Sequence, residues 1–404
     1  MSFISGGWRD VYLASGARAV SSCGDLLAAT ALVLELQARA VGGLAVAAVL
    51  IAAALPPVLL ARWSGRLVDR VDSRLLLTIA GLAQAAICVA LAFASSAGEM
   101  IALVSVLAAG LAVSQPCLSA LVPSMVTAGD LLRAVALGQT ASSAGMLAAP
   151  ALGGILLGHF GLRLPLLADA VSYLAIAGAG WLIRTRRGGG STQSPRADAE
   201  RLSGWRLRQD RLMWSAIAAI GAVVAAVSLV NVAEVFFVRG VLHSTTTAYG
   251  LLESAWTISA LAGAWLLARR RPSDAVMGVA LVGALAVTCL GVALSATVPD
   301  VGWLVPASIV GGLGNGAVSN AAGVLVGRRT PASARGHAFA VLNAVANGAS
   351  TLGYLAGGLL LALIPVRVAI ASAGLAGLAV AAAFTVPVLY ATGVLTGPAT
   401  GARV

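Results

Sequence analysis

Residues 65–74 read GRLVDRVDSR and separate two long apolar stretches of the chain, at about 41–63 and 75–96. Each stretch has roughly the 20 apolar residues that a helix needs to cross a bilayer. The charged segment therefore lies in a loop between two predicted membrane-spanning helices.

The composition of the whole chain agrees with this interpretation. The 404 residues are 59% hydrophobic and only 10% charged, with a mean hydropathy of +0.94, whereas soluble domains are about 45–50% apolar and about 25% charged. We predict an all-α polytopic membrane protein with twelve transmembrane helices. They are expected at 11–37, 41–63, 75–96, 100–122, 134–158, 164–184, 214–238, 248–268, 274–296, 301–327, 338–364 and 366–392.

The longest polar interval divides these helices into two sets of six. Residues 185–213 are rich in Gly, Ser, Pro and charge and show no apolar period, which is typical of a flexible linker. We therefore expect an N-terminal six-helix bundle at 1–184, a cytoplasmic linker at 185–213 and a C-terminal six-helix bundle at 214–404.

Two glycine motifs make the halves resemble each other. The fifth and eleventh predicted helices each close on a Gly-Gly pair before a short turn. Small residues let helices approach closely in a membrane, and the repetition predicts two pseudo-repeat bundles with a central site between them. The residues assigned to helix packing are Gly145, Pro150, Gly153, Gly154, Gly357 and Gly358.

The arginines indicate the orientation of the chain. All 26 basic residues are arginine; with a cytoplasmic N-terminus, 21 fall in inside segments, 4 (Arg39, Arg163, Arg239 and Arg367) fall in outside segments, and Arg18 remains within the first helix. Basic residues accumulate in cytoplasmic loops. We predict a multi-pass protein of the cell membrane with both termini in the cytoplasm.

The loop at 65–74 resembles the signature of the Major Facilitator Superfamily, which runs Gly-x-Leu-x-Asp-Arg before further basic residues. The matching positions are Gly65, Leu67, Asp69, Arg70 and Arg74. The chain is similar in particular to the branch of macrolide and siderophore (enterobactin) exporters, through Gly24-Asp25 in the first helix and Arg335-Gly336 before the eleventh.

This resemblance implies transport by rocking of two halves, with the loop acting as a cytoplasmic gate at Gly65, Asp69, Arg70 and Arg74. Asp69 can accept hydrogen bonds from a neighbouring helix N-terminus and from arginines, while Gly65 permits a close helix approach. The alternative is a solvated basic loop, and its arginines also suit anionic lipid head groups. Residues 100–122 contain no arginine, which excludes proton coupling through the helix 4 arginine of many drug antiporters.

Charged residues within the predicted helices are candidate functional groups, because each costs at least ~2.5–3.5 kcal/mol in a bilayer. Asp25 follows Arg18 by seven residues on the same helix face. Asp25 is the best candidate for a proton-carrying carboxylate or for a contact with a cationic substrate; the alternative is a structural ion pair or hydrogen bond.

The other charged residues are assigned more weakly. Glu234 lies three residues from Asn231 on one helix face and would line the cavity from the second half, or else lie in water near the outer interface. Asp169 is expected to serve in packing or capping, and Glu253 lies only about one turn into its helix.

The sequence offers no motif of another function class. The four cysteines and three histidines show no metal-ligand spacing, and no Walker or hydrolase motif is present. We predict no enzyme, no cofactor, no metal and no nucleic-acid partner, but a monomer that meets membrane lipids, protons and a small-molecule substrate.

The leading hypothesis is an exporter of a small amphipathic drug or secondary metabolite, driven by proton antiport. The alternatives are an importer or lipid-handling carrier and, from another class, a non-transporting membrane sensor or scaffold.

Overall fold

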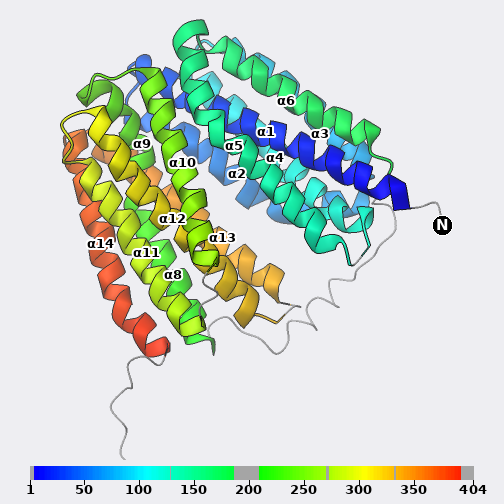
Figure 1. Ribbon diagram of the computed structural model, residues 1–404. Helices are drawn as coiled ribbons and strands as arrows, with labels where there is room; N and C mark the ends of the chain where they lie inside the picture. Colours follow the sequence, from blue (N-terminus) through cyan, green and yellow to red (C-terminus); the bar gives the residue numbers. More distant parts are fainter. Residues whose placement is uncertain (1–3, 128, 186–208, 270–272, 332–333, 393–404) are drawn as a thin grey trace, which may run out of the picture. The chain divides into compact units, whose positions relative to one another are not determined.

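The computed structural model describes residues 4–127, 129–185, 209–269, 273–331 and 334–392, and their regular secondary structure is entirely helical (Figure 1). The first set of helices is α1 (Ile4–Ala38), α2 (Gly43–Arg70), α3 (Ser73–Ala92), α4 (Ala97–Met125), α5 (Leu131–Phe160) and α6 (Arg163–Leu182). The second is α8 (Arg211–Val227), α9 (Val230–Phe236), the π-helical η2 (Phe237–Val241), α10 (Thr246–Ala268), α11 (Asp274–Ser295), α12 (Val301–Arg329), α13 (Arg335–Leu360) and α14 (Val366–Ala391).

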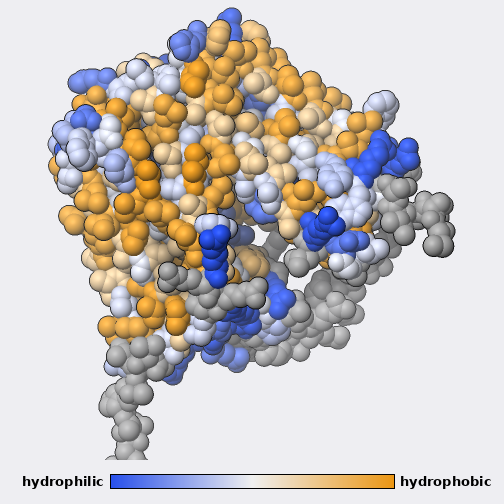
Figure 2. All heavy atoms as spheres, in the orientation of Figure 1, coloured by the Kyte–Doolittle hydropathy of each residue, from blue (hydrophilic) through white to orange (hydrophobic). Residues whose placement is uncertain are grey.

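These helices are suited to a membrane. Within the described residues, 11 helical segments are long and apolar enough to cross a bilayer. Helix α13, which carries Asn343 and Asn347, is outside this set. Figure 2 shows hydrophobic residues over most of the visible surface. The chain is a multi-pass membrane protein, and the predicted all-α polytopic fold is confirmed.

The chain forms two units, and each unit combines residues from two separate parts of the sequence. Unit 1 comprises residues 1–192 and 243–254, and unit 2 comprises residues 193–242 and 255–404. The first half of α10 thus clusters with the N-terminal helices. Most of the predicted linker, residues 186–208, lies outside the described residues, so the boundaries at 184 and 214 stay a prediction.

Several helices begin at polar residues that satisfy free backbone N–H groups. Ser96 and Glu99 form a capping box at α4, and the carboxylate of Asp300 accepts from the N–H groups of Gly302 and Trp303 at α12. Such caps pair donors that have no partner within the helix. Short polar sequences between apolar runs therefore place these helix starts.

The seventh predicted span differs from a single helix at 214–238. Helix α8 ends at Val227, α9 begins at Val230, and the span finishes in the π-helical η2. The Asn231 amide donates to the carbonyl oxygen of Ser228 at 3.3 Å. Because such side chains compete for the backbone groups of the helix, they favour a break at this position.

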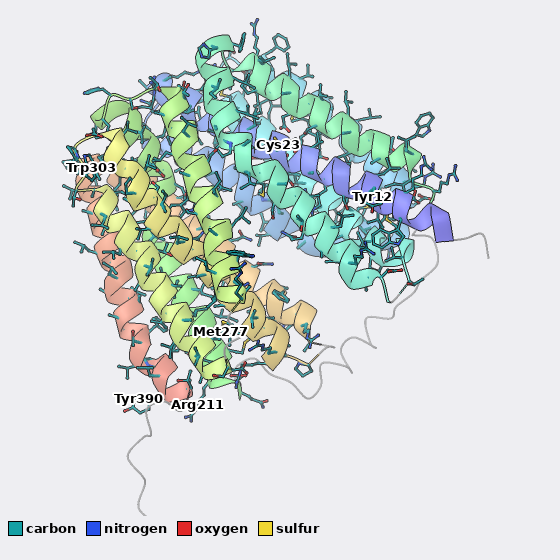
Figure 3. All side chains as sticks on the ribbon, in the orientation of Figure 1. Tyr12, Cys23, Arg211, Met277, Trp303 and Tyr390 are labelled. Carbon is teal, nitrogen blue, oxygen red and sulfur yellow. The ribbon has the colours of Figure 1, made fainter. Side chains whose placement is uncertain are left out.

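The same pattern of helix packing occurs in both units. In unit 1, α1 packs on α5 and α6, while α3 packs on α4 and α6; in unit 2, α8 packs on α13 and α14, while α11 packs on α12 and α14. Figure 3 shows Arg211 at the start of α8 and Tyr390 near the end of α14 at one end of unit 2, with Trp303 of α12 at the other. This is the arrangement of helices that alternate in direction.

Candidate functional site

Unit 1 contains a cavity of about 530 Å³ to which all six of its N-terminal helices contribute. Most of the lining is apolar, from residues such as Leu32, Val104 and Leu111. The polar lining residues are Arg18, Ser22, Asp25, Gln115, Gln139, Ser142, Asp169 and Tyr173. A cavity of this size with a few polar groups is typical of a small-molecule site.

Asp25 connects α1 to α6 at the wall of this cavity. The hydroxyl of Tyr173, a residue with no exposed surface, donates to Asp25 Oδ1 at 2.5 Å. The two residues are 148 positions apart in sequence. Asp25 therefore has a hydrogen-bond partner on another helix, which the hypothesis of a structural role requires. It also lines the cavity, which the hypothesis of a proton-carrying or substrate-binding role requires.

A second carboxylate, Asp169, lies in the same cluster and is fully buried. Its Oδ1 accepts from Ser172 Oγ at 2.9 Å and its Oδ2 accepts from the Cys88 thiol at 3.4 Å. A Cβ on Gly24 would collide with Asp169 Oδ1 and with the Ser172 side chain. Glycine at position 24 thus lets α1 lie close enough to α6 to bring Asp25 and Asp169 into one polar cluster.

Arg18 lines the cavity from the same helix as Asp25, but it binds a different neighbour. Its Nη1 donates to Ser119 Oγ of α4 at 3.2 Å, and its Nε is buried without a hydrogen-bond partner. Arg18 and Asp25 both line the cavity, and their predicted roles in proton coupling or substrate binding stay predictions.

The predicted polar residues of the second half lie in unit 2, on α9. Asn231 is exposed and donates to the Ser228 carbonyl in the break between α8 and α9, while Glu234 is half-buried. Neither lines the cavity of unit 1. Their role toward a substrate stays a prediction.

The residues of the predicted gate lie at the end of α2 and the start of α3. Arg70 is exposed, and a Cβ on Gly65 would meet no described atom within 4 Å. Arg74 donates from Nη2 to the carbonyl oxygen of Trp181 at 2.7 Å and from Nε to that of Gly180 at 3.3 Å. It therefore ties α3 to the end of α6. The side chain of Asp69 lies outside the described residues, so the gate stays a prediction.

The residues of the predicted packing motif occur where helices approach closely. Cβ atoms on Gly145 and Gly153 would collide with the backbone of α1 at Ala19 and Leu27. A Cβ on Gly154 would collide with the Thr246 carbonyl of α10. Beside it, Pro150 lies against Gly250 in the same way, and Gly357 lies against Leu229 in unit 2. Gly358 is buried in α13.

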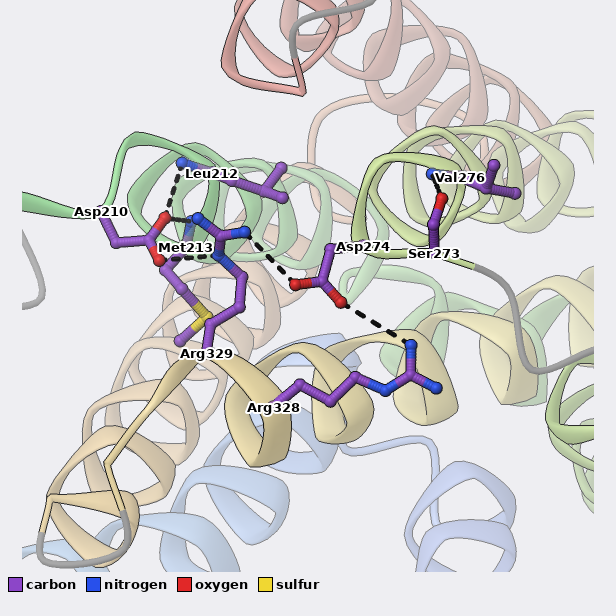
Figure 4. A network of polar contacts seen from close by, with 8 residues as sticks. All are labelled: Asp210, Leu212, Met213, Ser273, Asp274, Val276, Arg328 and Arg329. Atoms are coloured by element: carbon purple, nitrogen blue, oxygen red, sulfur yellow. Dashed lines mark hydrogen bonds and ion pairs between the residues drawn. The ribbon is translucent and has the colours of Figure 1, made fainter.

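Unit 2 has a polar cluster of another kind, at the end where α8 and α11 begin and α12 ends (Figure 4). Arg329 Nε lies 2.7 Å from Asp210 Oδ2, and its Nη1 lies 3.3 Å from Asp274 Oδ2. Arg328 Nη1 lies 3.7 Å from Asp274 Oδ1. Because Asp210 also caps α8, this network ties three helix ends together.

The corresponding end of unit 1 is held by different bonds. Asp10 of α1 is buried, and its Oδ2 accepts from the backbone N–H groups of Arg184 and Thr185 and from the Thr185 hydroxyl, at 2.7–3.0 Å. This carboxylate fixes the chain that leaves α6 against the start of α1.

The structure adds Tyr173 to the candidate site and places Asp169 in the same cluster. From the sequence, Asp169 is expected to serve in packing or capping, and that role stays a prediction. The spacing of four residues between Asp169 and Tyr173 puts both on one face of α6, and this was the available signal. In the described ranges, no group of three His, Cys, Asp or Glu side chains is placed to hold a metal ion.

Comparisons with known proteins agree with this architecture. The model of the family described as Major Facilitator Superfamily matches residues 14–306, which is more than half of the chain. None of the curated proteins matches at the sequence level.

Two solved structures show the same fold. A mutant of the nucleoside transporter NupG is 14% identical, with a TM-score of 0.77 over 94% of this chain and 99% of that one. A bacterial homologue of the human lysosomal transporter Spinster, solved inward-facing and unoccupied, is 13% identical, with a TM-score of 0.68 over 96% of each chain. With its matching family model, its membrane helices and its repeated packing, the chain belongs to the Major Facilitator Superfamily.

Proposed function

We propose that this protein is a secondary active transporter that exports a small amphipathic molecule by alternating access, in antiport with protons. The observation that carries the proposal is the cavity of unit 1, where an apolar lining surrounds Arg18, Asp25 and Asp169. Charged groups are costly in a membrane interior and are found there mainly at substrate and ion pathways.

The cluster of Asp25, Asp169 and Tyr173 is the proposed proton site. Two carboxyl groups in one buried cluster repel each other when both are ionised, and a proton shared between them relieves that repulsion. Both carboxylates line the cavity, but Asp25 is half-buried, whereas Asp169 has no exposed surface. In this proposal Asp25 exchanges the proton, and Asp169 and Tyr173 stabilise its two states.

The composition of the cavity supports an amphipathic substrate. A sugar presents many hydroxyl groups and needs a dense polar lining, because buried polar groups without partners are unfavourable. Here the polar side chains occur among a larger number of Leu, Val and Ala residues. The direction of transport, outward, rests on the resemblance of the chain to the macrolide and siderophore exporter branch.

The proposal includes the orientation and the gate. Both termini lie in the cytoplasm of a cell-membrane protein, consistent with the 21 to 4 distribution of arginines. The loop with Gly65, Asp69, Arg70 and Arg74 then faces the cytoplasm, where it would close the inner side in the outward-facing state. The protein acts as a monomer with lipids around it.

The test is an accumulation assay with amphipathic fluorescent dyes and drugs in a host that lacks its own efflux pumps. Cells with the wild-type protein should accumulate less dye than cells without it, and an uncoupler should abolish the difference. Everted vesicles should take up the same dye when the proton gradient is imposed. Uptake by whole cells instead of efflux would establish the importer.

Purified protein in liposomes distinguishes the hypothesis of a carrier from that of a non-transporting sensor. A dye gradient that the protein dissipates, with counter-movement of protons, supports the proposal. Wild-type liposomes that move neither dye nor protons would contradict transport itself and favour the sensor or scaffold.

A further inference from the structure

Arg18 lies between two cavities of unit 1. It is on α1, the helix on which Figure 3 labels Tyr12 and Cys23. One cavity is the apolar one described above, and the other, of about 230 Å³, is lined by α1, α4 and α5. Arg18 and Gln139 line both. The guanidinium therefore reaches the place where the two cavities adjoin.

The charge of Arg18 has no acidic partner among the described residues. Its hydrogen bond goes to the neutral hydroxyl of Ser119, and its Nε is buried without a partner. Arginine stays protonated in proteins, and the half-buried guanidinium of Arg18 lies in an apolar bundle, where a charge without a counterion is unfavourable. An anion from outside the protein would complete this site.

The carboxylates of the cavity are engaged elsewhere. Asp25 accepts from Tyr173, and Asp169 accepts from Ser172 and Cys88. Seven residues of helix separate Arg18 from Asp25, or about 10 Å at 1.5 Å per residue. The cavity thus has a cationic end at Arg18 and a carboxylate cluster farther along α1.

The neutral polar groups near Arg18 complement it. Gln115 and Gln139 line the main cavity, and their amides can donate hydrogen bonds. We propose that Arg18, with Gln115 and Gln139, binds the carboxylate, sulfonate or phosphate head group of a drug-sized amphipathic anion whose apolar body fills the main cavity. This inference rests on the proposed function, since it names the chemical class of the substrate.

The experiment compares two probes that differ by one charged group. Anilinonaphthalene sulfonate and N-phenyl-naphthylamine share the same aromatic body, and only the first carries a sulfonate. Both are titrated against full-length protein in nanodiscs of zwitterionic phosphatidylcholine, with empty nanodiscs subtracted. The wild type should bind the sulfonate saturably and more tightly than the neutral probe.

Substitutions at Arg18 should act on one probe alone. Charge-assisted hydrogen bonds of this kind predict that Arg18→Gln weakens sulfonate binding roughly tenfold to a hundredfold and leaves the neutral probe unchanged. Arg18→Lys should lose less, because it keeps the charge. Arg39→Gln is the matched control, since Arg39 lies at the end of the same helix and pairs with Glu35 at 2.8 Å.

A second variant tests the charge without removing the arginine. Because Ser119 Oγ already contacts Arg18, Ser119→Asp should supply an internal counterion and suppress sulfonate binding, whereas Ser119→Asn should not. This pair stays informative if Arg18→Gln does not fold.

Three outcomes would overturn the inference: sulfonate binding by Arg18→Gln and Ser119→Asp at wild-type strength, an equal loss of both probes, or the absence of saturable sulfonate binding to the wild type. If added phosphatidylglycerol displaces the sulfonate, the ligand of this site is a lipid head group and not a drug-sized anion. The binding assay is independent of transport, so a protein that binds the sulfonate through Arg18 but moves no dye would contradict only the proposed function.

Discussion

Units 1 and 2 share one pattern of helix packing, but their polar residues occupy different places. Unit 1 has Arg18, Asp25 and Asp169 around a cavity within its bundle. In unit 2, the charged network of Asp210, Asp274, Arg328 and Arg329 lies at helix ends, and Glu234 is half-buried on α9. The two units thus share the packing pattern of their helices but differ in where their charged side chains lie.

The difference suggests a division of roles between the units. Ion pairs at helix ends lie near water, where they cost little and stabilise by about 0–1 kcal/mol each. Charged groups inside a bundle are costly and need a reason to be retained. We therefore expect substitutions inside unit 1 to affect transport most and substitutions at the end of unit 2 to affect mainly stability.

The strongest test of this contrast is Asp25→Asn. It should reduce proton-driven transport by more than about tenfold while the protein still exchanges substrate down its gradient, because the amide keeps the bond to Tyr173 but cannot carry the proton. Active transport and counterflow in proteoliposomes measure the two activities. Glu35→Gln on the same helix is the control, and full active transport by Asp25→Asn would contradict the proton role.

The next effect is expected at the end of unit 1, from Asp10→Ala. This change leaves two backbone N–H groups and one hydroxyl without their acceptor, at a cost of about 1–3 kcal/mol. The midpoint of thermal unfolding in detergent should fall. Thr185→Val removes only one of the three bonds and should have a smaller effect; equal midpoints for the two variants would show that Asp10 does not hold α6.

Gly24→Ala tests the close contact that assembles the carboxylate cluster. Its methyl group would collide with Asp169 and Ser172, and overpacking of this kind costs about 1–3 kcal/mol. Gly16→Ala is the matched control on α1, because its Cβ would meet no described atom within 4 Å. The measurement is the midpoint of thermal unfolding of each variant. Equal midpoints for Gly24→Ala and Gly16→Ala would show that α1 can move away from α6 without loss of stability.

The smallest effect is expected for Arg329→Gln in unit 2. Arg329 and Asp210 are 33% and 13% exposed, so the loss should be about 0.5–1 kcal/mol and should diminish in high salt. A double-mutant cycle with Asp210→Asn, which keeps the helix cap, isolates the pair. A loss that does not respond to salt would assign the effect to packing.

The membrane class and the family could be predicted because they depend on local sequence. Long apolar runs, the loop at 65–74 and the distribution of arginines are visible without any contact between helices. The break at Ser228 could not be predicted as reliably, because the apolar pattern continues through 214–238. The neighbours of Asp169 could not be predicted either, because spacing alone does not show which helices α6 contacts.

The sequence by itself determined that the chain crosses a membrane as helices, since a bilayer leaves backbone groups no partners except those within a helix. Only the tertiary structure decided which polar side chains meet. The bond from Tyr173 to Asp25 and the bond from Arg18 to Ser119 join residues 148 and 101 positions apart. Such contacts depend on how closely α1 approaches α6 and α4, and this distance is set by packing at residues such as Gly24 rather than by the apolar period of any one helix.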